Sequence, residues 1–357
     1  MSVDLLITGT GSLAQATLFD LMTITVAPLK IMLAGRHQKR LEWLVLGANA
    51  RAHALGTQHR TESRLIDWDK ADDLARLLNE SAPQAVFHAA SLQSAWDLRD
   101  TNNAWSSAVG ARGYGITLPL QLFLAIRLAR AMQEHTPTCR LVNACYPDVS
   151  NEILRRLGYE VLCGVGNVAT LASACAARVT LRDDGQLKMF AHHRQIALAT
   201  DGCMKASPPR LWVSDVELTP DAMPDIQLPR DASLNLVTGA CTARLLIAVL
   251  DRVERYVGHA PGPFGLPGGY PITVAGGTLQ LRLPNGVELA EAVSWNRASA
   301  NEEGLTLDAN GFIHVASSAV TRYATGSSLP SSYHIDDVEA VAEDMLQLKE
   351  VMRHQAA

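Results

Sequence analysis

Short apolar runs alternate with helix-compatible stretches from Leu5 to Cys163. The run over 85–90 is continuously apolar, which is typical of a parallel strand buried on both faces. Strand, helix and strand repeated in this way predict a doubly wound parallel sheet. The expected strands are 5–7, 30–34, 64–67, 85–90, 140–144 and 160–163, and the expected helices are one capped by Asp69 that carries Leu74, Leu77 and Leu78, then 118–133 and 151–157.

The pattern changes after about residue 170. Strands are expected at 179–181 and 188–190, joined by the turn Asp183-Asp184-Gly185, and a strongly apolar helix at 238–257. A hairpin is expected over 278–289. We therefore predict two domains, a dinucleotide-binding domain over 1–170 and an α+β substrate or dimerisation domain over 171–357.

The last helix is expected from about Asp336. Its apolar positions, three and four residues apart, form one stripe. Such a stripe either docks on its own domain or forms a dimer contact, and both readings stay open. The stripe consists of Val338, Val341, Met345, Leu348 and Met352.

A glycine-rich turn follows the first expected strand. Gly9, Gly11 and Ala14 occupy the three small positions of G-x-G-x-x-G/A, and a helix-compatible stretch follows. These residues permit a tight turn, close approach of backbone to a pyrophosphate, and close packing of helix on strand. This context indicates the dinucleotide site of a Rossmann domain; a plain strand-to-helix turn is the alternative. The predicted contacts are Gly9, Thr10, Gly11, Ser12 and Leu13.

The end of the second strand refines the cofactor. Residues 35–40 read Gly-Arg-His-Gln-Lys-Arg and contain no acid that could hold a ribose 2′-hydroxyl. A guanidinium binds a 2′-phosphate by charge and by paired hydrogen bonds. We therefore predict NADP, held chiefly by Arg36, with His37, Lys39 and Arg40 nearby. A solvated basic helix start is the alternative.

Composition narrows the class of protein. The net charge of −5 and the lack of a long basic block argue against nucleic acid as the main partner. No signal peptide is expected, because Asp4 interrupts the start and the following apolar run is only strand-length. No uninterrupted stretch of about 18 uncharged apolar residues suggests a membrane span.

The six cysteines are dispersed without a C-x-x-C pair, and several lie in apolar segments. We expect reduced, mostly buried thiols rather than disulfides or a zinc site. This usage predicts a cytoplasmic protein.

Further candidate residues follow the later strands, because ligands bind beyond the carboxyl ends of such sheets. A long loop over 92–115, with tryptophans and glycines, is predicted to be a substrate lid. The nicotinamide half of the cofactor is expected against Ala89, Ala90 and Ser91, with Asn143 at its ribose. The predicted substrate contacts are Arg112, Tyr114, Trp96 and Asn167; Arg112 as a surface residue, Asn143 as a turn former and Asn167 as a helix cap are the alternatives.

The order of these segments resembles the lactate/malate dehydrogenase superfamily. The resemblance covers about the first 200 residues and rests on Gly9 to Gly11, on Asn143 with Pro147-Asp148, on Gly164 to Asn167, and on Phe190 to His193. It implies an N-terminal Rossmann half, a C-terminal substrate domain and a catalytic histidine on a substrate-domain strand.

Two departures argue against ordinary lactate or malate activity. The family has an aspartate and a substrate-binding arginine after its Gly-x-x-Asn segment, where this chain has Ala169 to Ala172. The carboxylate that orients the histidine is therefore missing from that place. Opine dehydrogenases, which also join a Rossmann half to a domain that supplies a histidine, are a related comparison.

His193 and His192 are the candidate acid–base residues, because reduction of C=O or C=N needs a proton donor near neutral pH. On a strand the two rings would point to opposite faces, so only one would reach a cleft; we prefer His193. Asp183 or Asp184 is a candidate to orient it. The alternative is that the pair has no catalytic role, with one histidine buried in the core and the other exposed to solvent.

Two functions remain. The first is an NADP-dependent reductase of a carbonyl or imine in a small metabolite, possible as a homodimer. The second is an NADP-binding redox sensor or scaffold without turnover. The Tyr-x-x-x-Lys pair of short-chain dehydrogenases is absent, and no metal-ligand spacing occurs.

Overall fold

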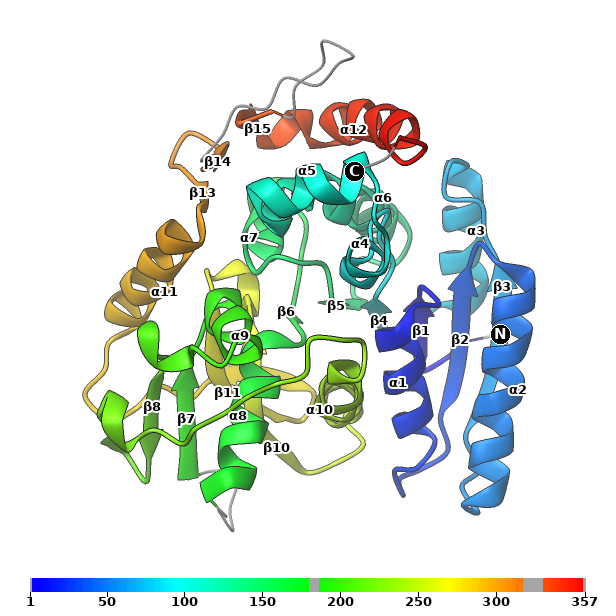
Figure 1. Cartoon of the computed structure of the whole chain (residues 1–357). Helices are drawn as coiled ribbons and strands as arrows, with labels where there is room; N and C mark the ends of the chain where they lie inside the picture. The colour runs from blue at the N-terminus through cyan, green and yellow to red at the C-terminus, as the bar shows by residue number, and fades with distance from the viewer. Residues whose placement is uncertain (1, 180–185, 317–329, 356–357) are drawn as a thin grey trace.

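The computed structural model describes residues 2–179, 186–316 and 330–355, without the side chains of Asp100 and Arg112. Its centre is a six-stranded, all-parallel sheet of order β3-β2-β1-β4-β5-β6 (Figure 1). This confirms the doubly wound sheet, whose strand order reverses between β1 and β4. The strands are β1 (Leu5–Thr8), β2 (Lys30–Gly35), β3 (Arg60–Leu65), β4 (Ala85–His88), β5 (Arg140–Asn143) and β6 (Cys163–Gly164).

Helices cover both faces of this sheet. Leu5 and Ile7 of β1 pack into one hydrophobic core and Leu6 into the other, as side-chain alternation along a strand requires. One core is completed by α1 (Ser12–Leu21), α2 (Gln38–Ala54) and α10 (Leu234–Val249). The other is completed by α3 (Ala71–Ser81), α6 (Leu118–His135), α7 (Val149–Arg156) and α12 (Val338–Met352).

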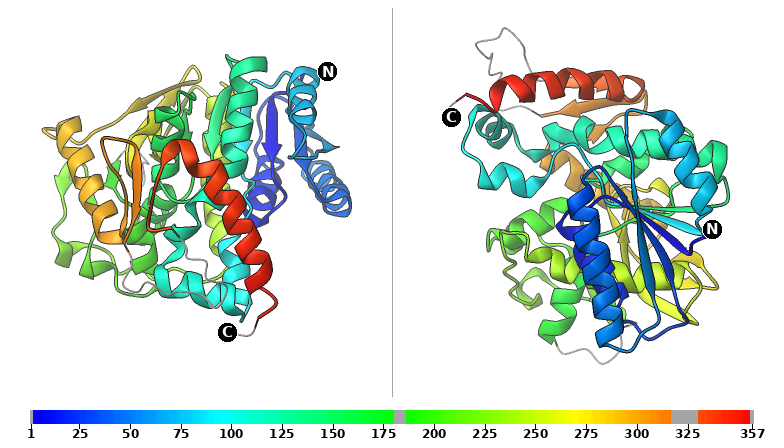
Figure 2. Two further views of the ribbon diagram at one scale, coloured as in Figure 1. Left: turned by 90° about the horizontal axis from the view of Figure 1, so that it is seen from above. Right: turned by 90° about the vertical axis from the view of Figure 1, so that its right-hand side faces the viewer.

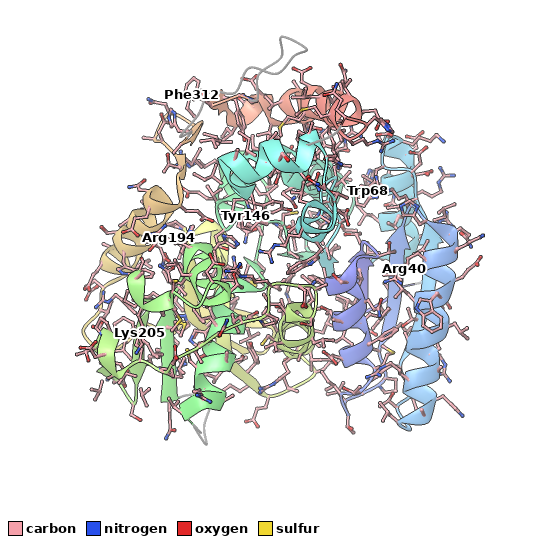
Figure 3. The ribbon with its side chains drawn as sticks, in the orientation of Figure 1. Arg40, Trp68, Tyr146, Arg194, Lys205 and Phe312 are labelled. Carbon is pink, nitrogen blue, oxygen red and sulfur yellow. The ribbon has the colours of Figure 1, made fainter. Side chains whose placement is uncertain are left out.

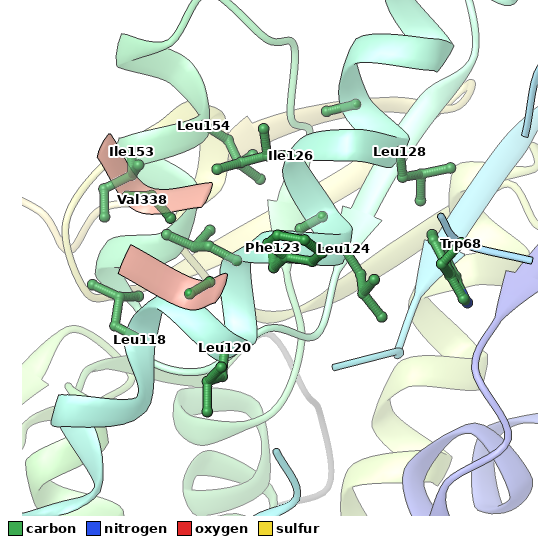
Figure 4. Close-up of a cluster of buried hydrophobic side chains, with 14 of the residues drawn as sticks. Trp68, Leu118, Leu120, Phe123, Leu124, Ile126, Leu128, Ile153, Leu154 and Val338 are labelled. Atoms are coloured by element: carbon green, nitrogen blue, oxygen red, sulfur yellow. The ribbon is translucent and has the colours of Figure 1, made fainter. Parts of the chain in front are cut away.

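Helix α6 is the centre of the second core. Its side chains, among them Leu120, Phe123 and Leu124, meet α7 and α12 (Figure 4). Among the described residues, 114–135 is the one helical stretch long and apolar enough to cross a membrane by length and composition, although Arg127 and Arg130 interrupt its apolar run. However, 78% of its most apolar window is buried inside the protein. Its apolar character is explained by its place in the core.

The other described residues form three small antiparallel sheets with helices around them. Their strands are β7 (Leu187–Phe190), β8 (Arg210–Val213) and β9 (Val216–Glu217); β10 (Arg255–Pro261), β11 (Gly269–Ala275) and β12 (Thr278–Leu281); and β13 (Leu305–Leu307), β14 (Phe312–Val315) and β15 (Ser332–His334). The helices are α8 (Asn167–Val179), α9 (His193–Thr200) and α11 (Leu289–Glu303), with short 3-10 turns at 114–117, 204–206, 220–222, 263–265 and 335–337.

Three expectations for the N-terminal half are corrected. Strand β3 is 60–65 rather than 64–67, and most of its side chains are exposed, so its apolar signal was weak. The cap of α3 is Lys70, not Asp69. The expected loop over 92–115 contains α4 (Ala95–Asp100) and α5 (Ala104–Arg112), capped by Ser94 and Asn103 side chains.

Three further corrections concern the C-terminal half. Val179, expected to begin a strand, ends helix α8, and the rest of that strand and its turn, within 180–185, lie outside the described residues. Helix α10 spans 234–249, a turn follows it, and the last three residues of the expected helix, 255–257, belong to strand β10. Residues 287–289 form no strand, because Leu289 begins α11 and β12 pairs with β11 instead.

The stripe on the last helix docks on its own chain. Val338, Met345 and Met352 are buried in the core with α6, and Val341 and Leu348 pack against it. Helix α12 thereby lies across the outside of the molecule over α6 (Figure 2).

All six cysteines are free thiols, as expected. Cys163 and Cys175 are buried, and Cys203 is exposed. Among the described residues no group of three or more histidine, cysteine, aspartate or glutamate side chains could hold a metal ion.

Candidate active site

A cavity of about 870 Å³ lies at the carboxyl edge of the sheet, between β1 and β4 and the helices of the C-terminal half. Its position matches the crevice in which doubly wound sheets bind ligands. The lining residues that we predicted from the sequence are Gly9, Thr10, Gly11, Ser12, Leu13, Arg36, His37, Ala89, Ala90, Ser91, Trp96, Tyr114, Asn167 and His193. One cavity thus collects residues from both ends of the predicted site.

The two glycines of the first turn have different surroundings. Gly9 has φ +112°, and a Cβ there would lie 2.6 Å from the carbonyl carbon and oxygen of Ala89. Gly9 therefore permits the backbone contact between the β1 and β4 loops. A Cβ at Gly11 would meet nothing within 4 Å. Helix α1 begins beyond Gly11 without a side-chain cap, which leaves amide donors at its N-terminus facing the cavity.

The basic residues after β2 divide into two groups. Arg36 is exposed and lines the cavity together with His37. Arg40 does not line it: its Nε donates to the Thr10 carbonyl oxygen at 3.2 Å, and its guanidinium also bonds the Gln15 side chain. Arg40 therefore braces the glycine turn. Lys39 is exposed and is not part of the lining.

The other end of the cavity holds a histidine, a carboxylate and a tyrosine. His193 Nδ1 lies 2.5 Å from Glu303 Oε1, at the last residue of α11. The Tyr146 hydroxyl donates to the same Glu303 oxygen at 2.9 Å and lies 3.0 Å from His193 Nδ1. Tyr146 lies near the middle of the molecule, beside the helix that carries Arg194 (Figure 3).

The two histidines are not on a strand, contrary to expectation. Strand β7 ends at Phe190, His192 is the N-cap of α9, and His193 is its first residue. Both rings therefore reach Glu303 instead of opposite faces, with His192 Nδ1 3.0 Å from Glu303 Oε2. His193 lines the cavity, whereas the His192 side chain is only 4% exposed and does not.

Asp148 contacts the cluster formed by the two histidines, Glu303 and Tyr146. Its Oδ2 accepts from the backbone amide of His193 at 3.1 Å, and its Oδ1 accepts from the Asn167 side chain. Asn167 thus begins α8 and holds Asp148 rather than capping the helix. Burial raises the pKa of Asp148, against the lowering effect of the two histidines and Asn167.

Glu303 and His192 shift each other's pKa. Burial by itself would raise the pKa of Glu303, but the charges and hydrogen bonds of His193 and His192 lower it well below 4.5. Burial by itself would lower the pKa of His192, but the bond and the charge of Glu303 raise it above 6.5. The cluster therefore favours an ionised glutamate beside a cationic histidine.

Asn143 does not reach the cavity. It is 1% exposed, accepts from the Cys145 amide at 3.1 Å and donates to Asn151 Oδ1 at 2.8 Å. Its carboxamide is thus occupied in holding the turn after β5. Asn143 is therefore the turn-forming residue of our alternative interpretation, not a residue that lines the cavity.

The segment predicted as a lid forms one wall of the cavity. Trp96 and Tyr114 line it, and Arg99 stacks on the Trp96 ring at 5.4 Å and bonds the Arg230 carbonyl oxygen. Trp105 is buried and donates to Gln93. The side chain of Arg112 lies outside the described part of the chain.

Comparisons with known proteins were made on sequence and on fold. No family model and no curated protein matches the sequence. Solved structures do match: lactate dehydrogenase of Cryptosporidium parvum at 13% identity (TM-score 0.51, 85% of this chain and 96% of that chain) and malate dehydrogenase of Picrophilus torridus at 10% identity (TM-score 0.54, 98% and 100%). Malate dehydrogenase of Salinibacter ruber is similar at 13% identity (TM-score 0.52, 84% and 95%). The chain has the lactate/malate dehydrogenase fold.

Within this dehydrogenase fold, Glu303 is the residue that sequence reasoning missed. The sequence lacks a carboxylate at the family's position, and we considered Asp183 and Asp184, which lie outside the described residues. Glu303 meets His193 from 110 positions away, so no spacing could have indicated it. Tyr146 and Asp148 could have been identified from the sequence, because they belong to the same segment after β5 as Asn143.

We expect the pH dependence of stability to reveal this cluster. The depressed pKa of Glu303 stabilises the fold above pH 4.5, and this contribution is lost as the pH falls through its folded value. The raised pKa of His192 stabilises it below pH 6.5, and this is lost as the pH rises through its folded value. Glu303→Gln should therefore lower the free energy of unfolding most between pH 4.5 and 6.5, by about 2 kcal/mol.

Denaturant unfolding of both proteins from pH 4 to 9 measures this difference. The control is Glu302→Gln, which changes a neighbouring carboxylate whose side chain is 53% exposed and pairs with Arg194. The free energy of unfolding of this control should differ little from that of the wild type, and by nearly the same amount at every pH. A Glu303→Gln cost that is constant across the range, or greatest above pH 8, would contradict the ion pair.

Proposed function

We propose that the protein is an NADP-dependent oxidoreductase that reduces a carbonyl or imine of a small metabolite, with His193 as the proton donor. The observation that supports this most directly is the single cavity, which joins the Gly9–Ser12 turn and Arg36 at one end to His193 at the other. A dinucleotide bound along the carboxyl edge of such a sheet would extend from the glycine turn at one end of the cavity to His193 at the other.

The residues present fit a dinucleotide. Gly11 and the uncapped N-terminus of α1 would hold the pyrophosphate, since both line the cavity and no Cβ fills the space at Gly11. Ala89, Ala90 and Ser91 would face the nicotinamide half. The similar lactate dehydrogenase is described in complex with nicotinamide adenine dinucleotide. Our preference for NADP rests on this chain's Arg36 and on the absence of an acid at residues 35–40.

His193 is suited to hold and release a proton. Bound NADPH supplies the hydride. Because an ionised carboxylate only accepts, His193 Nδ1 donates to Glu303, and Nε2 is the nitrogen left for a group in the cavity. In the proposed step the His193 ring gives its Nε2 proton to the substrate oxygen or nitrogen, while Nδ1 stays bonded to Glu303. Trp96 and Tyr114 would enclose the substrate.

The test is NADPH consumption against a panel of aldehydes, ketones and 2-oxo acids, each with and without amines. Oxidation with at least one substrate, lost in an active-site variant, supports the proposal. Requirement for an amine identifies an imine as the reduced species. Saturable NADPH binding with no oxidation by any member would argue against turnover.

We expect Arg36→Glu to weaken NADPH binding about 10- to 100-fold and to leave NADH binding nearly unchanged. Charge-assisted hydrogen bonds contribute about 1.5–3 kcal/mol, and a glutamate would repel a 2′-phosphate. Fluorescence titration with both cofactors measures the two Kd values. The matched control is Lys39→Glu, which makes the same charge change outside the lining. Equal losses for NADPH and NADH in Arg36→Glu would contradict recognition of the 2′-phosphate.

One observation favours a second candidate, an NADP-binding sensor or scaffold without turnover. Among the described lining residues the lysine and arginine side chains are Arg36 and Arg99 only, and Arg99 is engaged with Trp96 and the Arg230 carbonyl. The described part of the cavity thus offers no uncommitted arginine to a 2-oxo acid beside His193. The panel above decides between this candidate and reduction of an uncharged substrate.

A further inference from the structure

We propose that Tyr146 is a positioning residue for His193, acting through its hydroxyl on the Nδ1 side of the ring. This inference deepens the proposed function and rests on it for the kinetic outcome. Tyr146 belongs to the turn after β5, and nothing in the motif at Asn143 requires a phenol there.

The three side chains form a closed triangle. His193 Nδ1 and Glu303 Oε1 are 2.5 Å apart, and the Tyr146 hydroxyl oxygen is 3.0 Å from the nitrogen and 2.9 Å from the carboxylate oxygen. The rings of Tyr146 and His193 also meet edge to face, with centroids 4.1 Å apart and planes at 72°. The phenol therefore limits both the distance and the rotation of the imidazole.

Counting protons assigns each bond. The single Tyr146 proton goes to Glu303, because the ionised carboxylate cannot donate. The Tyr146 oxygen then accepts from His193 Nδ1, which shares its proton between Glu303 and Tyr146. Burial and the Glu303 charge raise the pKa of Tyr146, so the phenol keeps its proton at any physiological pH. The triangle consequently holds the Nδ1–H form of His193 and leaves Nε2 for the cavity.

Tyr146 is itself held from the opposite side. Its ring packs on Tyr114, with centroids 4.7 Å apart. The Tyr114 hydroxyl donates to the Gln93 carbonyl oxygen at 3.2 Å and accepts from Gln121 Nε2 at 2.7 Å. These contacts tie Tyr146 to the wall formed by α6 and the segment before α4. The imidazole is thus fixed between Glu303 on α11 and a phenol anchored to the N-terminal half.

The test is Tyr146→Phe, which keeps the ring and removes the hydroxyl. We expect kcat for NADPH-dependent reduction to fall 10- to 100-fold, because a donor group that is free to rotate loses its near-attack geometry. The Kd for NADPH and the substrate KM should stay within about threefold, because phenylalanine keeps the ring that lines the cavity and the hydroxyl is already bonded to Glu303 and His193. The control is Tyr333→Phe on β15, which removes a buried hydroxyl that has no hydrogen-bond partner among the described residues. Its kcat should match the wild type.

A second readout is independent of turnover. Ring ¹⁵N NMR of the wild-type protein, assigned with His193→Gln, should show neutral His193 protonated on Nδ1, and Tyr146→Phe should show an increased Nε2–H fraction. A wild-type ring protonated on Nε2, or unchanged spectra and kcat in a folded Tyr146→Phe, would overturn the proposal. Absence of NADPH oxidation in the wild type with the expected spectra would instead refute the proposed function alone.

Discussion

Replacement of His193 by alanine is expected to lower kcat for NADPH-dependent reduction by about 10²- to 10⁴-fold, the range that a positioned general acid contributes. His193 lines the cavity, and its Nδ1 is engaged by Glu303 at 2.5 Å, so Nε2 is the nitrogen that a substrate would meet. Alanine removes the proton donor. The NADPH Kd should change little, because the residues proposed to hold the phosphates lie at the other end of the cavity.

Steady-state kinetics and cofactor titration on the same samples separate these effects. The control is Arg194→Ala, which changes the next residue of α9, whose side chain pairs with Glu302 and does not line the cavity. Added imidazole should restore part of the rate in His193→Ala. A variant that loses NADPH binding and rate together would indicate a structural role for His193, and one with unchanged kcat would exclude it as the donor.

The second large effect is expected from Gly9→Ala, which should destabilise the fold by about 3 kcal/mol or more. A left-handed φ of +112° is costly for alanine, and its Cβ would lie 2.6 Å from the Ala89 backbone and 2.8 Å from the Ala90 nitrogen. Neither neighbour can yield easily, since both follow a strand in the middle of the sheet. Thermal and denaturant unfolding measure the loss.

Gly11→Ala is the matched control from the same turn. Its φ of −72° suits any residue, and its Cβ would meet no atom within 4 Å. It should fold with wild-type stability and yet bind NADPH more weakly, because the methyl group would occupy the space proposed for the pyrophosphate. The roles of the two glycines would be refuted if Gly11→Ala were the destabilised variant, or if both bound cofactor normally.

The sequence was most informative where structure depends on local pattern. Continuous apolar runs such as Leu5 to Ile7 identified β1 and most of the parallel sheet, because strands buried on both faces leave no polar positions. The three-and-four spacing from Val338 to Met352 identified α12, although it did not say what the stripe packs against. Pattern failed at β3, where an edge strand with exposed side chains carries little apolar signal.

The glycine turn proposed to hold the cofactor could likewise be located from the sequence. A turn that brings backbone to a phosphate needs small residues at fixed spacing, so Gly9 and Gly11 could be recognised within a few positions of one strand. The sequence could not show which of the basic side chains after β2 are available to a ligand and which are bonded to the protein itself. Arg36 faces the cavity and Arg40 bonds the turn itself, a difference that depends on side-chain direction in the folded protein.

The sequence by itself thus determined the doubly wound sheet, the position of the glycine turn, and the candidate histidines, because each is encoded in short-range spacing. Only the tertiary structure decided which histidine faces the cavity and what orients it. His192 and His193 lie at the start of a helix rather than on a strand, and Glu303 and Tyr146 reach them from positions 110 and 47 residues from His193. Contacts between such distant residues follow from how the elements pack, and local sequence carries no record of that packing.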